Sequence, residues 1–166
     1  MNLSIVSAAN AEVTMLLSNW LKGMVAGFVA TVVLSILMLM KQQMGLMPEL
    51  NPIQMITDML GVPTPVVGWV MHFMIGTVVW GTLFAWLDPR LWGSHWLRGI
   101  WFGVGAWLLM MIIMMPMAGA GLFGMSLGIM APLMTLMLHL IFGLVLGWIY
   151  GLEHPDPVPE FQPSRR

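Results

Sequence analysis

The longest stretch of this sequence without a charged side chain is GIWFGVGAWLLMMIIMMPMAGAGLFGMSLGIMAPLMTLMLHLIFGLVLGWIYGL, residues 99–152. Its 54 residues are more than twice the roughly 20 apolar residues that a helix needs to cross a bilayer. The stretch therefore holds two crossings joined by an uncharged connection. Two shorter uncharged stretches, residues 23–40 and 59–87, hold one crossing each. The sequence thus predicts four transmembrane helices.

Charge is scarce in the chain as a whole. Charged residues make up 8% of its 166 residues and apolar residues 59%, whereas a typical soluble domain has about 25% charged and about 45–50% apolar residues. Four crossings in a chain of this length leave no room for a separate soluble domain. The net charge of −1 gives no basis for binding nucleic acid, and the absence of cysteine excludes disulfides, thiolate metal sites and cysteine nucleophiles.

We predict an all-α fold, an integral membrane four-helix bundle built from two parallel helical-hairpin repeats. The helices are expected at about residues 22–42, 65–87, 98–115 and 131–151, within one transmembrane domain over residues 22–152. Residues 1–21 mix apolar and polar side chains, which predicts an amphipathic helix lying in the membrane interface. Residues 153–166 contain four prolines without apolar periodicity, which predicts a flexible cytoplasmic tail.

The repeat is visible when the chain is compared with itself. The pattern L-G-[VI]-x-x-P-x6-H-x3-G occurs twice without gaps, at an offset of 67 residues. The first copy contains His72 and Gly76, and the second contains His139 and Gly143. Two hairpins that run in the same sense predict a pseudo-twofold axis along the membrane normal.

Small residues recur every four positions along the predicted helices. In lipid, close backbone approach at such residues supplies much of the attraction between helices. We therefore expect helix–helix contacts at these positions. The glycines concerned are Gly23, Gly27, Gly68, Gly76, Gly99, Gly103, Gly143 and Gly147.

His72 and His139 are the ionisable side chains expected well inside the hydrocarbon layer. Ionisable residues there are costly and are functional candidates by default. If both imidazoles point at the axis between the repeats, they provide a site for one haem b iron, bound from opposite sides, or for a single metal ion. The alternative is structural: each neutral imidazole hydrogen-bonds a hydroxyl or a carbonyl of a neighbouring helix. The sequence leaves both roles open, and the identity of any metal unknown.

The twenty methionines raise a copper hypothesis, because thioethers are soft ligands for monovalent copper. Adjacent methionines such as Met110 and Met111 point in different directions around a helix, and methionine also fills irregular apolar space well. We therefore interpret most of them as packing residues. No phosphate-binding loop, nucleophile elbow or zinc-binding helix motif occurs in the sequence, so we predict no catalytic residue and no enzymatic activity.

Lys and Arg residues beside the crossings predict the orientation, because they are in excess on the cytoplasmic side. Of the six Lys and Arg residues, five fall on one side of the membrane, and Lys41 alone falls on the other. We therefore predict a multi-pass protein with both termini in the cytoplasm. In the predicted cytoplasmic turn, Asp88 and Arg90 are expected to form a local ion pair, and His95 to be solvated. The basic residues on the predicted cytoplasmic side are Lys22, Arg90, Arg98, Arg165 and Arg166.

Several short motifs together carry a family resemblance. They are Gly23-x3-Gly27, MGLMP at residues 44–48, Gly68-x3-His72-x3-Gly76, FGVGAW at residues 102–107 and PMAGAG at residues 116–121. With these motifs the chain resembles an uncharacterised family of small four-helix bacterial inner-membrane proteins, over about residues 22–151. The resemblance implies a bacterial inner (cytoplasmic) membrane and four helices, and it carries over no activity, substrate or cofactor.

Three functional hypotheses follow. The leading one is a non-enzymatic packing module or accessory subunit, whose partners are the lipid bilayer and other membrane subunits or further copies of itself. The second is a b-type haem or metal protein that uses His72 and His139 in electron transfer. The third is a channel or small-solute transporter with its pore between the repeats. Besides the two histidines, the polar lining available to such a pore is Thr31, Ser35, Thr77, Thr82 and Thr135.

Overall fold

The computed structural model describes residues 3–153, which contain helices and no strand. Four helices are long and apolar enough to cross a membrane, so the expected all-α, four-helix membrane architecture is confirmed. Residues 154–166 of the expected tail lie outside the described residues. The first crossing is α1 (Leu3–Gln43), and the fourth is α7 (Met130–Glu153). The second crossing consists of α3 (Pro65–Met74), η1 (Ile75–Trp80) and α4 (Gly81–Leu87). The third consists of α5 (His95–Leu109), η3 (Met110–Met114) and α6 (Met115–Met117). The connections contain α2 (Pro52–Met59), η2 (Asp88–Arg90) and η4 (Leu122–Leu127).

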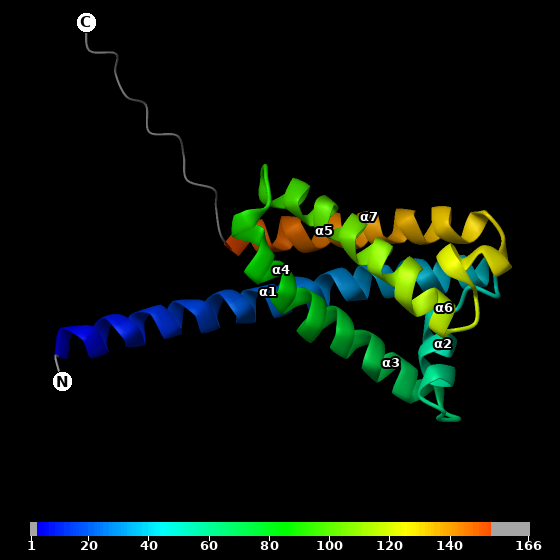
Figure 1. Cartoon of the computed structure of the whole chain (residues 1–166), viewed down its shortest axis with the longest axis horizontal. Coiled ribbons are helices and arrows are strands. Elements are labelled where there is room, and N and C mark those ends of the chain that lie inside the picture. The colour runs from blue at the N-terminus through cyan, green and yellow to red at the C-terminus, as the bar shows by residue number, and fades with distance from the viewer. Residues whose placement is uncertain (1–2, 154–166) are drawn as a thin grey trace, which may run out of the picture.

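Helix α1 differs from the expectation of a separate interfacial helix over residues 1–21. It runs without a break from Leu3 to Gln43, or 41 residues, about 62 Å at 1.5 Å per residue. Residues 3–21 contain neither glycine nor proline, so no helix-breaking residue ends the helix before the first crossing. The first part of α1 therefore extends beyond the other helices, as Figure 1 shows.

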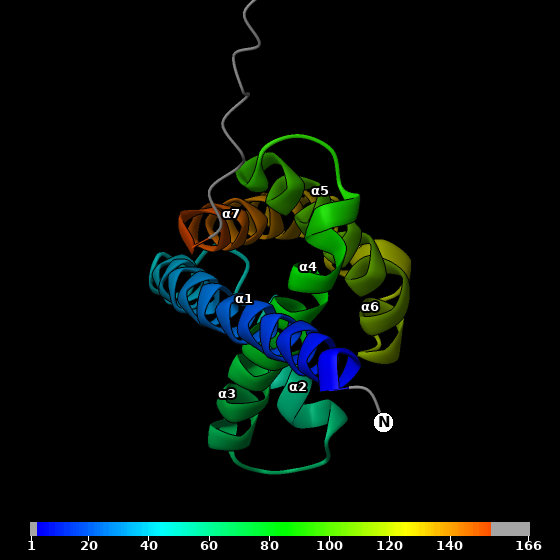
Figure 2. The same cartoon turned by 90° about the vertical axis from the view of Figure 1, so that its left-hand side faces the viewer.

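The crossings are arranged on two sides of α1. Figures 1 and 2 show α5 and α7 side by side on one side of α1 and α3 on the other. The extensive contacts join α5 to α7, α1 to α7, and α1 to η1 and α4. The start of α1 and the end of α7 lie toward the same end of the molecule, called here the inner end (Figure 1). The opposite end, with α2 and η4, is called the outer end.

Glycines allow the backbones of paired crossings to touch. A Cβ atom added at Gly99 would meet the backbone of Gly143, and one added at Gly103 would meet the carbonyl of His139. In the first hairpin, a Cβ at Gly23 would meet the carbonyl of Gly81. Close approach to another segment occurs at every glycine named above as a packing position: Gly23, Gly27, Gly68, Gly76, Gly99, Gly103, Gly143 and Gly147.

The two hairpins do not pack in the same register. Gly103, five residues after Arg98, faces the carbonyl of His139. Gly27, five residues after Lys22 at the start of the first crossing, faces the carbonyl of Gly76, one helical turn beyond His72. The two glycine-mediated crossings are therefore similar in kind and offset by about four residues. The internal duplication itself stays a prediction from the sequence.

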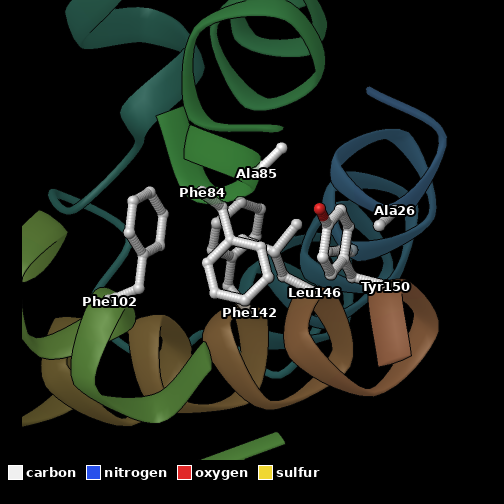
Figure 3. Close-up of a cluster of buried hydrophobic side chains, with 8 residues drawn as sticks. Ala26, Phe84, Ala85, Phe102, Phe142, Leu146 and Tyr150 are labelled. Carbon is white, nitrogen blue, oxygen red and sulfur yellow. The ribbon is translucent and has the colours of Figure 1, made fainter. Parts of the chain in front are cut away.

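An aromatic cluster joins the four crossings toward the inner end (Figure 3). The ring of Phe84 from α4 lies 5.3 Å from that of Phe102 on α5 and 5.4 Å from that of Tyr150 on α7, both edge to face. Edge-to-face pairs stabilise a core by about 0.5–1.5 kcal/mol each beyond the burial of area. Ala26 of α1 is fully buried against this cluster. The cluster holds the second and third crossings together here.

The uncharged connection between the third and fourth crossings folds back on itself. The Ser126 amide donates to the Ala120 carbonyl at 3.1 Å, and Phe123 packs its ring 5.8 Å from that of Trp107. Gly121 and Gly124 have φ of 76° and 67°, a conformation that costs a residue with a Cβ atom free energy. The connection satisfies several of its backbone groups internally and forms a cap on the outer end.

We expect Gly99→Ala to destabilise the protein and Gly105→Ala to leave it unchanged or slightly more stable. Replacing a helical glycine by alanine gains about 0.5–1 kcal/mol, but at Gly99 the new methyl group would strike backbone, which costs about 1–3 kcal/mol or more. A Cβ at Gly105 would meet nothing within 4 Å. Unfolding by denaturant in detergent micelles measures both changes. Equal stability of the two variants would contradict tight packing of α5 against α7.

Candidate functional site

A cavity lies between the crossings, on the outer-end side of the aromatic cluster. Its volume is about 130 Å³. Side chains from α1, α2, the second and third crossings and α7 line it, among them His72 and His139. The structure thus brings both intramembrane histidines to the wall of one cavity. This cavity is the candidate site.

His72 lines the cavity from α3 with an unused nitrogen. Its Nε2 atom is buried and has no hydrogen-bond partner among the described residues. The imidazole lies edge-on to the rings of Trp69 at 6.0 Å and Phe73 at 5.9 Å. A buried polar atom without a partner costs about 1–3 kcal/mol. His72 Nε2 is therefore a buried group that would gain from a hydrogen bond, which a molecule in the cavity could supply once the imidazole turns toward it.

His139 belongs to a polar group on α7. Its Nδ1 lies 2.8 Å from the Thr135 carbonyl. Because a carbonyl only accepts, Nδ1 carries the hydrogen, and Nε2 of the neutral ring is left as an acceptor. The Thr135 hydroxyl donates to the Ala131 carbonyl at 2.7 Å and receives a hydrogen bond from Trp107 Nε1 at 3.2 Å. The backbone of its own helix thus fixes the orientation of the His139 ring.

The cavity offers few other polar groups. Of the hydroxyls named above for a pore, Thr31 and Thr135 line it, and Ser35, Thr77 and Thr82 do not. The Thr31 hydroxyl donates to the Gly27 carbonyl at 2.7 Å, so it is already used within its own helix, as is that of Thr135. The described residues therefore build no continuous polar path for an ion along the cavity.

Lys41 lies at the outer end of the cavity and is 7% exposed. Its Nζ atom donates to the carbonyls of Leu46, Met47 and Leu50, at 3.1, 2.8 and 2.8 Å. An ammonium group has three donors, so all of its hydrogen-bonding capacity is used. These bonds fold the residues after α1 back onto its end and place Leu50, 1% exposed, in the outer core. From the sequence, Lys41 stood out only as the lone basic residue on its side of the membrane.

Two π-helical segments flank the cavity. Ile75, Gly76 and Trp80 of η1 line one wall, and Met110 and Met114 of η3 line another. Such segments are rare, and they occur frequently at functional sites because they change which side chains a helix presents. Pro116, two residues after η3, cannot donate the usual helical hydrogen bond to the carbonyl of residue 112, whereas no residue of this kind marks η1.

The inner end differs from the sequence prediction. Asp88 does not pair with Arg90: its carboxylate contacts His95 Nδ1 at 2.8 Å and Arg98 Nη1 at 3.0 Å. Arg90 instead places its guanidinium 4.5 Å above the ring of Trp86. The expectation of a solvated His95 was also wrong, because its side chain is 12% exposed. This cluster holds α5 to the turn before it.

A cofactor in the cavity would have to match its size and its ligands. Ligand pockets for drug-sized molecules measure about 300–1,000 Å³, so the helices would have to separate before a porphyrin could enter a space of about 130 Å³. Among residues 3–153, no group of three or more His, Asp or Glu side chains gathers to hold a metal ion. The donors that line the cavity are the two imidazoles and several methionine thioethers.

A family model matches residues 17–160, which is most of the chain. The chain belongs to DUF6789, a family of unknown function. The resemblance to an uncharacterised family is therefore confirmed, whereas the bacterial origin and the inner membrane stay predictions. No curated protein and no solved structure matches the chain.

We expect Lys41→Met to lower the free energy of unfolding by at least about 2 kcal/mol, because it leaves three carbonyl groups at the outer end without their donor. Gln42→Met is the matched control, since Gln42 is the exposed neighbour on the same helix. Thermal and denaturant unfolding in detergent measure both variants. A Lys41→Met protein as stable as the control would show that these bonds do not hold the connection.

Proposed function

We propose that this protein is a non-enzymatic accessory subunit, which binds another membrane protein through the projecting part of α1. The chain is a member of a family of unknown function with four apolar helices. The proposal rests on one observation. Helix α1 extends past the other crossings, and the apolar side chains of this part are not covered by any other described residue.

The length of α1 supports this function. From Gly23, where it meets Gly81, to Gln43, α1 is about 31 Å long, which matches the bilayer core of about 30 Å. The residues before Gly23 add about 30 Å more on the inner side. Several of these carry large exposed side chains: Val13, Met15, Leu17, Trp20 and Leu21 are each 44–67% exposed. Contact with a partner would remove this apolar surface from water, a gain of about 25 cal/mol per Å².

The interior of the protein agrees with a structural role. The closest contacts between crossings are backbone contacts at glycines. Lys41 is the one charged residue lining the cavity, and its three donors are already used by carbonyl groups. The two imidazoles in the wall have no carboxylate beside them among the residues that line the cavity. Such an interior supports a packing module rather than a centre for acid–base or nucleophilic chemistry, in which a nucleophile and a base are held together beside the substrate.

We expect Leu17→Glu to weaken association with the partner by at least about tenfold, because burial of a leucine side chain contributes about 1.5–3 kcal/mol. Ser18→Glu is the matched control: it adds the same charge to an exposed neighbour without removing apolar surface. Cross-linking in native membranes, followed by purification in mild detergent, measures the associated fraction. A strictly monomeric wild-type protein without a co-purifying partner would overturn the accessory role.

A second candidate function is a b-type haem or metal protein, possible because His72 and His139 line one cavity. The two imidazoles would be the ligands, and a bound haem would supply one-electron redox chemistry. His139 Nε2 has the free lone pair that an iron ligand needs. The small volume of the cavity counts against this candidate.

This candidate predicts a coloured protein. If it holds, the purified protein has a Soret band, and His72→Ala and His139→Ala each abolish it because both axial ligands are needed. His154→Ala is the control, since this histidine follows the four predicted crossings in the sequence. The absorption spectrum together with metal analysis tests it. A colourless protein without bound metal would end this candidate.

A further inference from the structure

The cavity is partly open and lies between the second and third crossings, with α2 along its outer side. Within the described residues, no extensive contact joins α3 or η1 to η3 or α6, whereas aromatic rings join α4 to α5 at the inner end. Figure 2 shows that α3 and α6 lie farther apart than α4 and α5, with α2 between them. Most residues that line the cavity lie within the membrane spans, whereas those of α2 do not.

The wall of the cavity is apolar and rich in sulfur and aromatic groups. Sulfur atoms contact aromatic rings favourably, by about 0.3–1.5 kcal/mol, and aromatic rings stack on one another. Trp80 and Phe142 supply aromatic rings to the wall. The methionines that line the cavity are Met38, Met55, Met59, Met110, Met114 and Met115.

One fully buried polar atom in this wall lacks a partner, and His139 Nε2, which is not fully buried, also lacks one among the described residues. His72 Nε2 is buried without a hydrogen bond in the described structure, while Lys41 has used its three donors. An apolar molecule with one oxygen beside His72 would supply the missing hydrogen bond to Nε2 and bring no other polar group against the wall. No carboxylate lines the cavity, and the Lys41 ammonium stands at its outer end, so a bound cation would meet repulsion and no counter-charge.

We propose that this cavity binds the oxygen-bearing ring of a lipid-soluble phenol or quinone, with His72 Nε2 hydrogen-bonded to the ring oxygen. Its volume of about 130 Å³ is close to the roughly 150 Å³ of an apolar protein cavity that takes up benzene. The methionine and aromatic wall favours a flat ring over an acyl chain, and any tail would leave through the open part of the cavity. This site does not depend on the accessory role of α1.

Binding is measured in phospholipid nanodiscs with decylubiquinone and with the same benzoquinone ring without its tail. Quenching of tryptophan fluorescence reports binding, because Trp80 lines the cavity. Ala106→Phe fills the cavity from α5, where Ala106 is 4% exposed and lines the wall. Gly105→Phe is its matched control: it adds the same ring one residue earlier, where a Cβ would meet nothing within 4 Å. His72→Phe keeps the ring shape and removes the nitrogen.

We expect saturable binding that Ala106→Phe abolishes, His72→Phe weakens by about tenfold and Gly105→Phe leaves unchanged. If the tailed quinone binds more strongly than the free ring, the ligand is a membrane lipid. If the two bind equally, the ligand is a small phenol or quinone. Either outcome supports the proposed site. Unaltered binding in His72→Phe would overturn the proposal. If Ala106→Phe does not fold, the affinity of His72→Phe is sufficient by itself to test the site. No saturable binding of either ring would also overturn it, as would displacement of both rings by oleyl alcohol at equal concentration, because an acyl chain would then be the preferred occupant.

Discussion

Backbone contact at glycine is the constraint on which the rest of the structure depends. Lipid tails are as apolar as leucine, so helices in a bilayer gain little from burying apolar side chains against one another. They gain from close packing instead, and close packing needs positions without a Cβ atom. Gly99 against Gly143 and Gly23 against Gly81 supply these positions. These contacts fix how the other three crossings lie around α1.

Such contacts hold the helices together over part of their length and let them diverge elsewhere. The aromatic cluster around Phe84 and Phe102 closes the space between the second and third crossings toward the inner end. Toward the outer end the same crossings separate, and the cavity occupies the space between them. Lys41 then closes the outer connection by bonding three carbonyl groups. The cavity and the Lys41 hydrogen bonds that close the outer connection both lie beyond the region of tight helix contacts.

The two histidines acquire different environments within this frame, although they occupy equivalent places in the sequence pattern. His139 is bonded to the backbone of its own helix, while His72 Nε2 has no partner in the described chain. The glycine contacts of the two hairpins also differ in position by one helical turn relative to these histidines. A repeated motif in the sequence therefore does not imply two equal halves of one site.

The sequence by itself determined the number of crossings and their approximate ends, because absence of charge and apolar length are local properties that lipid requires. It also identified the glycines at which helices meet and the two histidines inside the membrane. Only the tertiary structure decided which faces of the helices enclose a cavity, that Asp88 pairs with His95 and Arg98, and that α1 continues past the bundle. The physical reason is that lipid and protein interior are equally apolar, so hydropathy along a membrane helix does not distinguish the side facing a cavity from the side facing lipid.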